Sequence, residues 1–150
     1  MVNTLVNLVW KTLLKVHENQ INAFISDPHG TQKRELSKIL TKASNTEWGQ
    51  RYQFSKINSD KLLAKHIPIF EYDQIKDDIF RMMEGEKDVL WPGRVYRFAK
   101  SSGTTSDKSK YIPVTEDNHR YCHSKGGFRL LSRMYSNIKN PNFVEGKSIV

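Results

Sequence analysis

Residues 95–114 constrain the possible folds of this chain more than any other stretch. An apolar and aromatic segment at residues 95–99 leads into residues 101–110, a run dense in serine, threonine and glycine. Residues 111–114 then return to an apolar pattern. β-Branched and aromatic residues favour strands, whereas clusters of small polar residues between them are typical of loops. The sequence therefore predicts a strand, a loop and a second strand, with Thr115 as the N-cap of a following helix.

Residues 101–110 form either a phosphate-binding loop or a solvated connection. A loop of this composition leaves backbone N–H groups uncovered, and Gly103 lets the backbone approach a ligand closely. Lys108 and Lys110 add the positive charge that a phosphate site uses. Small polar residues also make up loops that bind nothing, so composition leaves both interpretations open. The run matches neither the Walker A pattern nor the GxGxxG fingerprint, which disfavours the usual nucleotide folds.

The 150 residues carry a formal net charge of +8, with 37% hydrophobic and 11% aromatic residues, a composition that indicates a folded domain. Nine basic and three acidic residues lie between Arg94 and Arg133, so much of the excess charge surrounds the loop. Such a patch suits a phosphorylated ligand, a nucleic acid or an anionic membrane, although solvated helix faces show the same pattern. Cys122 is the only cysteine, which excludes an intrachain disulfide and a cysteine zinc site and fits a reducing, cytoplasmic setting.

Helical periodicity dominates the first part of the chain. It predicts one helix at residues 2–25 and a second at residues 31–44, separated by a break at residues 27–30. We expect these two helices to pair and to cover another part of the fold, because neither buries its apolar stripe alone. The first helix lacks a basic leader, and its apolar run is too short to span a bilayer. Its expected inward stripe consists of Leu5, Leu8, Val9, Thr12, Leu13, Val16, Ile21, Phe24 and Ile25.

Residues 45–58 break both periods and predict an irregular connection, in which aromatic side chains serve as anchors or as a binding surface. A short helix is expected at residues 59–65, and an extended stretch at residues 67–69, where a proline disfavours helix for the residue before it. The next helix, at residues 71–84, ends at a C-cap glycine, Gly85. Its expected inward residues are Ile75, Ile79, Met82 and Met83.

The helix that begins after Thr115 is expected to run to about residue 135. Gly126 and Gly127 inside it predict close backbone packing or a local bend, because glycine is costly in a helix interior. Three side chains on this helix are of metal-ligating types, but no carboxylate partner accompanies them, and we expect no metal site. They are His119, Cys122 and His123.

Residues 140–142 predict a turn, and residues 147–150 read as the first residues of a buried strand. A domain rarely ends on the opening residues of a strand, so we expect the chain to be a piece of a longer protein. No arrangement of nucleophile and base, or of paired carboxylates, follows from the spacing, and the catalytic residues stay unknown.

The loop resembles the phosphate-binding motif of the adenylate-forming enzymes, the superfamily of acyl-CoA synthetases, luciferase and peptide-synthetase adenylation domains. Residues 101–105 match its Ser/Thr-Ser-Gly-Thr-Thr core, and Lys110 takes the place of its lysine. Ser106 and Asp107 depart from the glycine that often follows the two threonines. The chain as a whole resembles the Gretchen Hagen auxin-responsive acyl-acid amido synthetase family, its bacterial members in particular. The segments that carry this resemblance are Trp48-Gly49 with Tyr52 and Phe54, and residues 67–73, 83–86, 98–105 and 110–115.

The resemblance implies an α/β fold, of which this chain is the N-terminal portion of a larger adenylating domain, mostly helical with a few strands. A helical cover would span residues 1 to about 85, and the first strands, the phosphate loop and the following helix about residues 89–150. The rest of the adenylating domain and the C-terminal domain of the family would lie beyond Val150. We therefore expect this chain to be inactive alone.

The resemblance also implies a reaction. A carboxylic acid is activated by ATP, with Mg2+, to an acyl-adenylate, and an amine such as an amino acid then displaces AMP to form an amide. The partners would be small molecules, with no nucleic acid and no membrane. The residues carried over as phosphate binders are Ser101, Ser102, Gly103, Thr104, Thr105 and Lys110.

Two other functions fit the residues. The net charge and the interleaved aromatic residues suit a basic nucleic-acid-binding module, although no nucleic-acid recognition motif is present. The amphipathic N-terminal helices suit a helical protein-interaction domain. The resemblance favours the synthetase over both.

Overall fold

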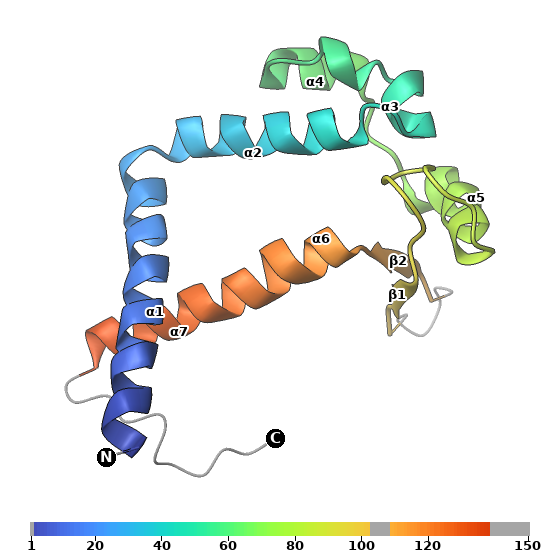
Figure 1. Cartoon of the computed structure of the whole chain (residues 1–150). Helices are drawn as coiled ribbons and strands as arrows, with labels where there is room; N and C mark the ends of the chain where they lie inside the picture. The colour runs from blue at the N-terminus through green and yellow to red at the C-terminus, as the bar shows by residue number, and fades with distance from the viewer. Residues whose placement is uncertain (1, 103–108, 139–150) are drawn as a thin grey trace. The chain divides into compact units, whose positions relative to one another are not determined.

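The computed structural model describes residues 2–102 and 109–138, which belong to two compact units (Figure 1). One unit comprises residues 1–28 and 119–150, and the other comprises residues 29–118. The elements of the chain, in order, are α1 (Val2–Ser26), α2 (Pro28–Ala43), α3 (Glu47–Arg51), the 3-10 turn η1 (Phe54–Lys56), α4 (Asp60–His66), α5 (Tyr72–Met83), β1 (Arg97–Lys100), β2 (Tyr111–Val114), α6 (Glu116–Asn118), the π-helical η2 (His119–Ser124) and α7 (Lys125–Asn137).

Helix α1 packs against α7 in the first unit. The Ser132 hydroxyl, which is 2% exposed, donates a hydrogen bond to the carbonyl oxygen of Leu14 at 2.5 Å. The rings of His17 and Phe128 stack with centroids 5.5 Å apart. The expected helix at residues 2–25 is confirmed as α1, which packs on α7. The expected pairing of this helix with the helix that follows it stays a prediction, because the two helices belong to different units.

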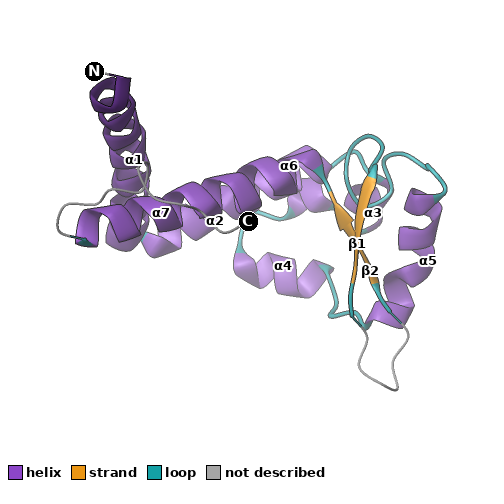
Figure 2. Cartoon of the chain, turned by 90° about the horizontal axis from the view of Figure 1, so that it is seen from below, coloured by secondary structure: helices purple, strands orange, loops and turns teal. Residues whose placement is uncertain are grey.

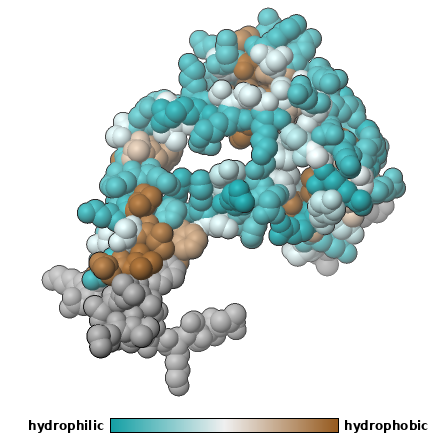
Figure 3. Space-filling model, viewed as in Figure 1, coloured by the Kyte–Doolittle hydropathy of each residue, from teal (hydrophilic) through white to brown (hydrophobic). Residues whose placement is uncertain are grey.

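The expected inward stripe of α1 is also wrong where the structure describes its side chains. Leu14 is the buried residue of α1, because it lies on the side of the helix that meets α7. Figure 3 shows apolar side chains gathered on the surface over α1. Among the described residues, no helix has both the length and the apolar character needed to cross a membrane. The large apolar side chains of α1 that are exposed are Leu8, Val9, Leu13, Val16, Phe24 and Ile25.

A cluster of buried apolar side chains forms the core of the second unit. Met82, Val89 and Val95 make up this cluster, and Trp48 and Phe98 are among the half-buried residues packed around it. The inward orientation of Met82 is thereby confirmed. Its neighbour Met83, expected to be inward too, is 39% exposed, because the next position on a helix turns about 100° away from the buried face. Ile79, one turn earlier than Met82, is buried as expected.

Local side-chain and backbone signals set most of the helix ends. Pro28 begins α2, where a missing N–H costs nothing, so the break after α1 is the single residue Asp27. The expected irregular connection at residues 45–58 is wrong, because it contains α3 and η1. The Thr46 hydroxyl accepts the Gly49 N–H at 3.0 Å and so caps α3.

The helices at residues 59–65 and 71–84 are confirmed as α4 and α5. Ser59 caps α4 by accepting the Leu62 N–H at 3.3 Å. Gly85 follows α5 with a φ of 103° and donates its N–H to the Met82 carbonyl at 3.1 Å, as its expected C-cap role requires.

Strands β1 and β2 pair antiparallel, and the strand–loop–strand expectation is confirmed for the described residues. Lys100 stands opposite Tyr111, and Arg97 stands opposite Val114. Helix α5 contacts β2, and the views place the hairpin beside this helix (Figure 2). After β2, the Thr115 hydroxyl accepts the Asn118 N–H at 3.0 Å, which confirms it as a cap.

Helical structure continues from α6 through η2 and α7 to Asn137, close to the expected end. The expected close packing at Gly126 and Gly127 is wrong, because a Cβ built at either position meets no other described atom within 4 Å. The irregularity lies just before them, in the π-helical η2. The turn expected at residues 140–142 and the strand expected at residues 147–150 lie outside the described residues.

Gly49→Ala should destabilise the second unit. A Cβ at this position would lie 2.0 Å from the Ala43 carbonyl oxygen and 2.7 Å from the Ser44 carbonyl, so the backbone itself would have to move. We expect a loss of at least about 2 kcal/mol in the free energy of unfolding, measured by urea titration. Gly126→Ala is the matched control, because its Cβ has open space in a helix and should leave the stability equal or raise it by up to about 1 kcal/mol. Equal effects of the two substitutions would contradict the close approach at Gly49.

Candidate functional site

The two ends of the predicted phosphate loop meet at the end of the hairpin where this loop connects β1 to β2. The Ser101 N–H donates to the Lys110 carbonyl at 2.9 Å, and the Lys110 N–H donates to the Ser101 hydroxyl oxygen at 2.9 Å. The structure thus brings together two of the six predicted binders, with Ser102 exposed beside them. The other three binders lie outside the described residues, together with Asp107 and Lys108; they are Gly103, Thr104 and Thr105.

We call Ser101, Lys110 and Tyr111 the loop root. Helix α5 holds it from one side, since the Tyr111 N–H donates to the hydroxyl oxygen of Tyr72 at 2.8 Å. The Phe80 ring, also from α5, meets the Tyr111 ring edge to face with centroids 6.3 Å apart. The sequence patterns did not identify Tyr72 as a residue of the site. Its hydrogen-bond partner Tyr111 lies 39 positions further along the chain, and no local spacing marks the pair.

Two lysine ammonium groups flank the loop root, each beside an aromatic ring. The Nζ atom of Lys110 lies 5.7 Å from the centroid of the Tyr72 ring, and that of Lys100 lies 6.0 Å from the centroid of the Tyr111 ring. Both lysines are exposed, so their ammonium groups stay accessible to a ligand. A cation beside a ring face is attracted by the π system, which favours one position of an otherwise flexible side chain.

The donor set at the loop root is of the kind that binds phosphate groups. It combines two ammonium groups, on Lys100 and Lys110, with the hydroxyls of Ser101 and Ser102, and ionised donors make the strongest hydrogen bonds to phosphate oxygens. The described residues contain no group of three histidine, cysteine, aspartate or glutamate side chains that could hold an ion.

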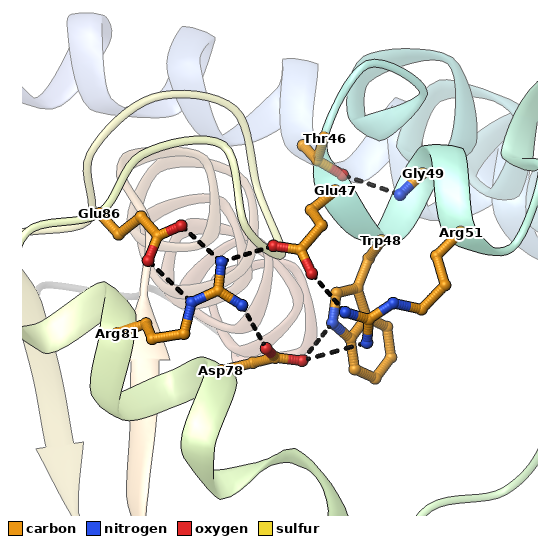
Figure 4. Close-up of polar contacts among 8 residues, drawn as sticks. All are labelled: Thr46, Glu47, Trp48, Gly49, Arg51, Asp78, Arg81 and Glu86. Carbon is orange, nitrogen blue, oxygen red and sulfur yellow. Dashed lines mark hydrogen bonds and ion pairs between the residues drawn. The ribbon is translucent and has the colours of Figure 1, made fainter.

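A guanidinium bound to three carboxylates lies between α3, α5 and the segment after α5 (Figure 4). Arg81 donates to Glu47 at 2.6 Å, to Asp78 at 2.8 Å and, through its Nε atom, to Glu86 at 2.7 Å. We call these four residues the Arg81 clasp. The clasp joins α5, which carries Arg81 and Asp78, to α3 and to the segment that follows α5.

The segment after α5 is also tied to α3 through the backbone. The Glu47 N–H donates to the Asp88 carbonyl at 2.7 Å, and the Trp48 N–H donates to the Val89 carbonyl at 3.1 Å. These bonds hold Val89 in the core cluster, against which Phe98 of β1 packs. The clasp therefore fixes the surface on which β1 lies just before it reaches the loop root.

Aromatic side chains complete this support. Trp48 donates its indole N–H to Asp78 at 2.7 Å. Its ring lies 5.1 Å from the rings of both Tyr52 and Phe70, measured between centroids. The aromatic side chains of residues 45–58 were expected to be either anchors or a binding surface. Trp48 and Tyr52 are anchors.

The family of the chain follows from comparison with known proteins. A family model described as the GH3 family N-terminal domain matches residues 17–150. This chain belongs to the GH3 family. The match confirms the resemblance to the amido synthetases drawn from the sequence, and the mostly helical structure with its two-stranded sheet agrees with an N-terminal portion of a GH3 domain.

Three relatives show the similarity of this GH3 chain to proteins with assigned names. Indole-3-acetic acid-amido synthetase GH3.2 of Arabidopsis thaliana is 28% identical over 65% of this chain and 18% of its own length. The 4-substituted benzoates-glutamate ligase GH3.12 of the same plant is 31% identical over 64% and 17%. Jasmonoyl--L-amino acid synthetase JAR4 of Nicotiana attenuata is 28% identical over 65% and 17%. The GH3 chain thus spans less than a fifth of the length of these relatives.

Substituting Arg81 should remove an acid-sensitive part of the stability of this GH3 chain. Hydrogen bonds from Arg81 lower the pKa of Glu47 and the pKa of Glu86 below the ordinary value of 4.5. A lowered pKa in the folded state stabilises it above the unfolded pKa, and this stabilisation is lost as the pH falls through the folded pKa. Urea titrations between about pH 6 and about pH 3 should therefore show a shallower pH dependence for Arg81→Met than for the wild type.

Arg120→Met is the control for this measurement, because Arg120 is an exposed side chain on η2 outside the clasp. It should leave the pH dependence of the unfolding free energy as in the wild type. An Arg81→Met curve parallel to that of the wild type would show that the clasp contributes nothing in solution.

Proposed function

We propose that this GH3 chain carries the ATP phosphate-binding loop of an acyl-acid amido synthetase of the adenylate-forming superfamily. The observation that carries the proposal is the mutual pairing of Ser101 and Lys110. These residues are the first and last positions of the sequence match to the superfamily motif, and they meet at one end of the hairpin with lysine ammonium groups beside them. An anionic ligand at this position would find hydroxyl and ammonium donors together.

The chemistry would proceed in two steps. A carboxylate oxygen of the acid attacks the α-phosphorus of ATP, supplied as its Mg2+ complex, and the bond to pyrophosphate breaks. The nitrogen of an amine then attacks the acyl carbon, and the bond to AMP breaks as the amide forms. The ATP supplies the leaving group that makes the carboxylate reactive.

The residues of this chain would bind and orient phosphates in that reaction. Backbone N–H groups and hydroxyls of residues 101–105 would hold the β- and γ-phosphates, and Lys110 would offset their charge. Donors fixed before the ligand arrives need little reorganisation when charge develops on the departing pyrophosphate. The pairing of Ser101 with Lys110 and the contact of Tyr111 with α5 would fix the two ends of this loop.

The substrates would be a small organic acid and an amine. The names of the relatives describe amide ligases for indole-3-acetic acid, for 4-substituted benzoates with glutamate, and for a jasmonoyl group with an amino acid. We infer the same reaction class here and assign no particular acid. Because the chain spans less than a fifth of those relatives, we place the activity in a longer protein and expect the 150-residue chain alone not to turn over ATP.

The test is carboxylate-dependent ATP–pyrophosphate exchange by the longer protein that contains this chain. Lys110→Ala and Thr104→Ala should each lower the exchange roughly tenfold to a hundredfold, since each removes a donor to a charged phosphate. Lys33→Ala, which removes an exposed lysine of α2, should leave the rate unchanged. A folded protein that shows no exchange with any acid of a broad panel would refute the proposal.

A further inference from the structure

Tyr72 contacts the loop root with both parts of its side chain. Its hydroxyl oxygen accepts the Tyr111 N–H at 2.8 Å, and its ring centroid lies 5.7 Å from the Nζ atom of Lys110. The first contact fixes the peptide unit at which the loop rejoins β2. The second contact places the Tyr72 ring beside the ammonium group of Lys110, the residue to which the proposed function assigns phosphate binding. One residue therefore constrains the backbone and the ammonium group of the same site.

The position of Tyr72 is itself fixed by the start of α5. Tyr72 is the first residue of the helix, directly after the capping residue Glu71, whose N–H donates to the Gln74 side chain at 2.7 Å. This capping box limits the directions in which the helix can begin. One further contact comes from the same helix, because Phe80 packs against the ring of Tyr111. The loop root is thus attached to an element whose N-terminus is held in place.

We propose that Tyr72 is a positioning residue for the phosphate site of this GH3 protein. It would fix the Lys110–Tyr111 peptide and hold the Lys110 ammonium group before ATP binds. The inference rests on the proposed function, because it concerns the same site. It goes beyond that function by assigning a role to a residue outside the loop, on a different element of the chain.

The physical reason is the reduced freedom of Lys110. A lysine side chain loses much rotamer freedom when it is immobilised by a ligand, and this loss weakens binding. A ring that already restricts the ammonium group lowers the loss at the moment of binding. A hydrogen bond to the Tyr111 N–H does the same for the backbone, since it removes motion at the end of the loop.

Tyr72→Phe tests the hydroxyl while keeping the ring. In the longer protein, we expect the KM for ATP in carboxylate-dependent ATP–pyrophosphate exchange to rise roughly threefold to tenfold, the factor that the loss of one neutral hydrogen bond brings. The KM for the carboxylic acid should stay unchanged, because the substitution acts at the phosphate end alone. The control is Tyr96→Phe, which keeps the ring beside Arg94 and changes a tyrosine that is 79% exposed. It should change neither constant.

A double-mutant cycle separates positioning from a purely structural role. If the Tyr72 ring holds the Lys110 ammonium group, combining Tyr72→Leu, which removes the ring as well as the hydroxyl, with Lys110→Ala should raise the KM for ATP by less than the product of the two single effects. A KM for ATP in the double variant that rises by the full product of the two single effects would overturn the proposal.

Hydrogen exchange of the wild-type protein provides a test that needs no folded variant. The Tyr111 amide should exchange slowly, because it is bonded to Tyr72. An amide that exchanges at the rate of an open chain would overturn the inference, as would an unchanged KM for ATP in Tyr72→Phe or an equal rise of the KM values for ATP and acid. Those outcomes leave the proposed function intact, provided that the wild type catalyses exchange. A wild type without carboxylate-dependent exchange would overturn the proposed function, and the inference with it.

Discussion

The second unit depends on one guanidinium group. Arg81 satisfies carboxylates from α3, from its own helix and from the segment after that helix, and each of them needs the positive charge because the three lie close together. Without Arg81, Glu47, Asp78 and Glu86 would repel one another. With it, they join three parts of the chain that also meet in the apolar core, through Trp48, Met82 and Val89. The pKa of Arg81 is raised first by its bond to Glu86 and then by its bond to Glu47, which keeps the charge in place at any ordinary pH.

The order of support runs from this clasp to the loop root. The clasp and two backbone hydrogen bonds place Val89 in the core, Phe98 of β1 packs on that core, and β1 leads to Ser101. On the other strand, Tyr111 is held by Tyr72 of the helix that carries the clasp. Both ends of the loop are therefore positioned by α5, one through the core and one directly. A candidate binding site built in this way inherits its geometry from a helix that contributes no residue to the predicted motif.

Sequence patterns predicted those features that short-range chemistry decides. The two strands, the Thr115 cap and the C-cap at Gly85 follow from residues within a few positions of each other, and all are confirmed, although β1 begins at Arg97, two residues later than expected. The partner of α1 was not predictable, because the helix carries apolar residues on more than one side and periodicity does not say which side meets a neighbour. For the site, the sequence predicted that Ser101 and Lys110 belong to one loop, whereas their mutual hydrogen bonds and the contact with Tyr72 depend on strand pairing and tertiary packing.

The extended segment between α4 and α5 makes the chain susceptible to proteolysis at this place. Ile69 is 99% exposed, and residues 67–71 lie outside any helix, so this stretch offers the open backbone that a protease cleft requires. A cut there would separate α3 and α4 from α5 and the hairpin in the covalent chain. The two pieces would still be held by the bond from Arg81 to Glu47 and by the ring contact between Trp48 and Phe70, which cross the cut. Nicking at this segment would thus leave a non-covalent complex, held also by the backbone hydrogen bonds from Glu47 and Trp48 to residues 88 and 89 and by the packing of α1 on α7.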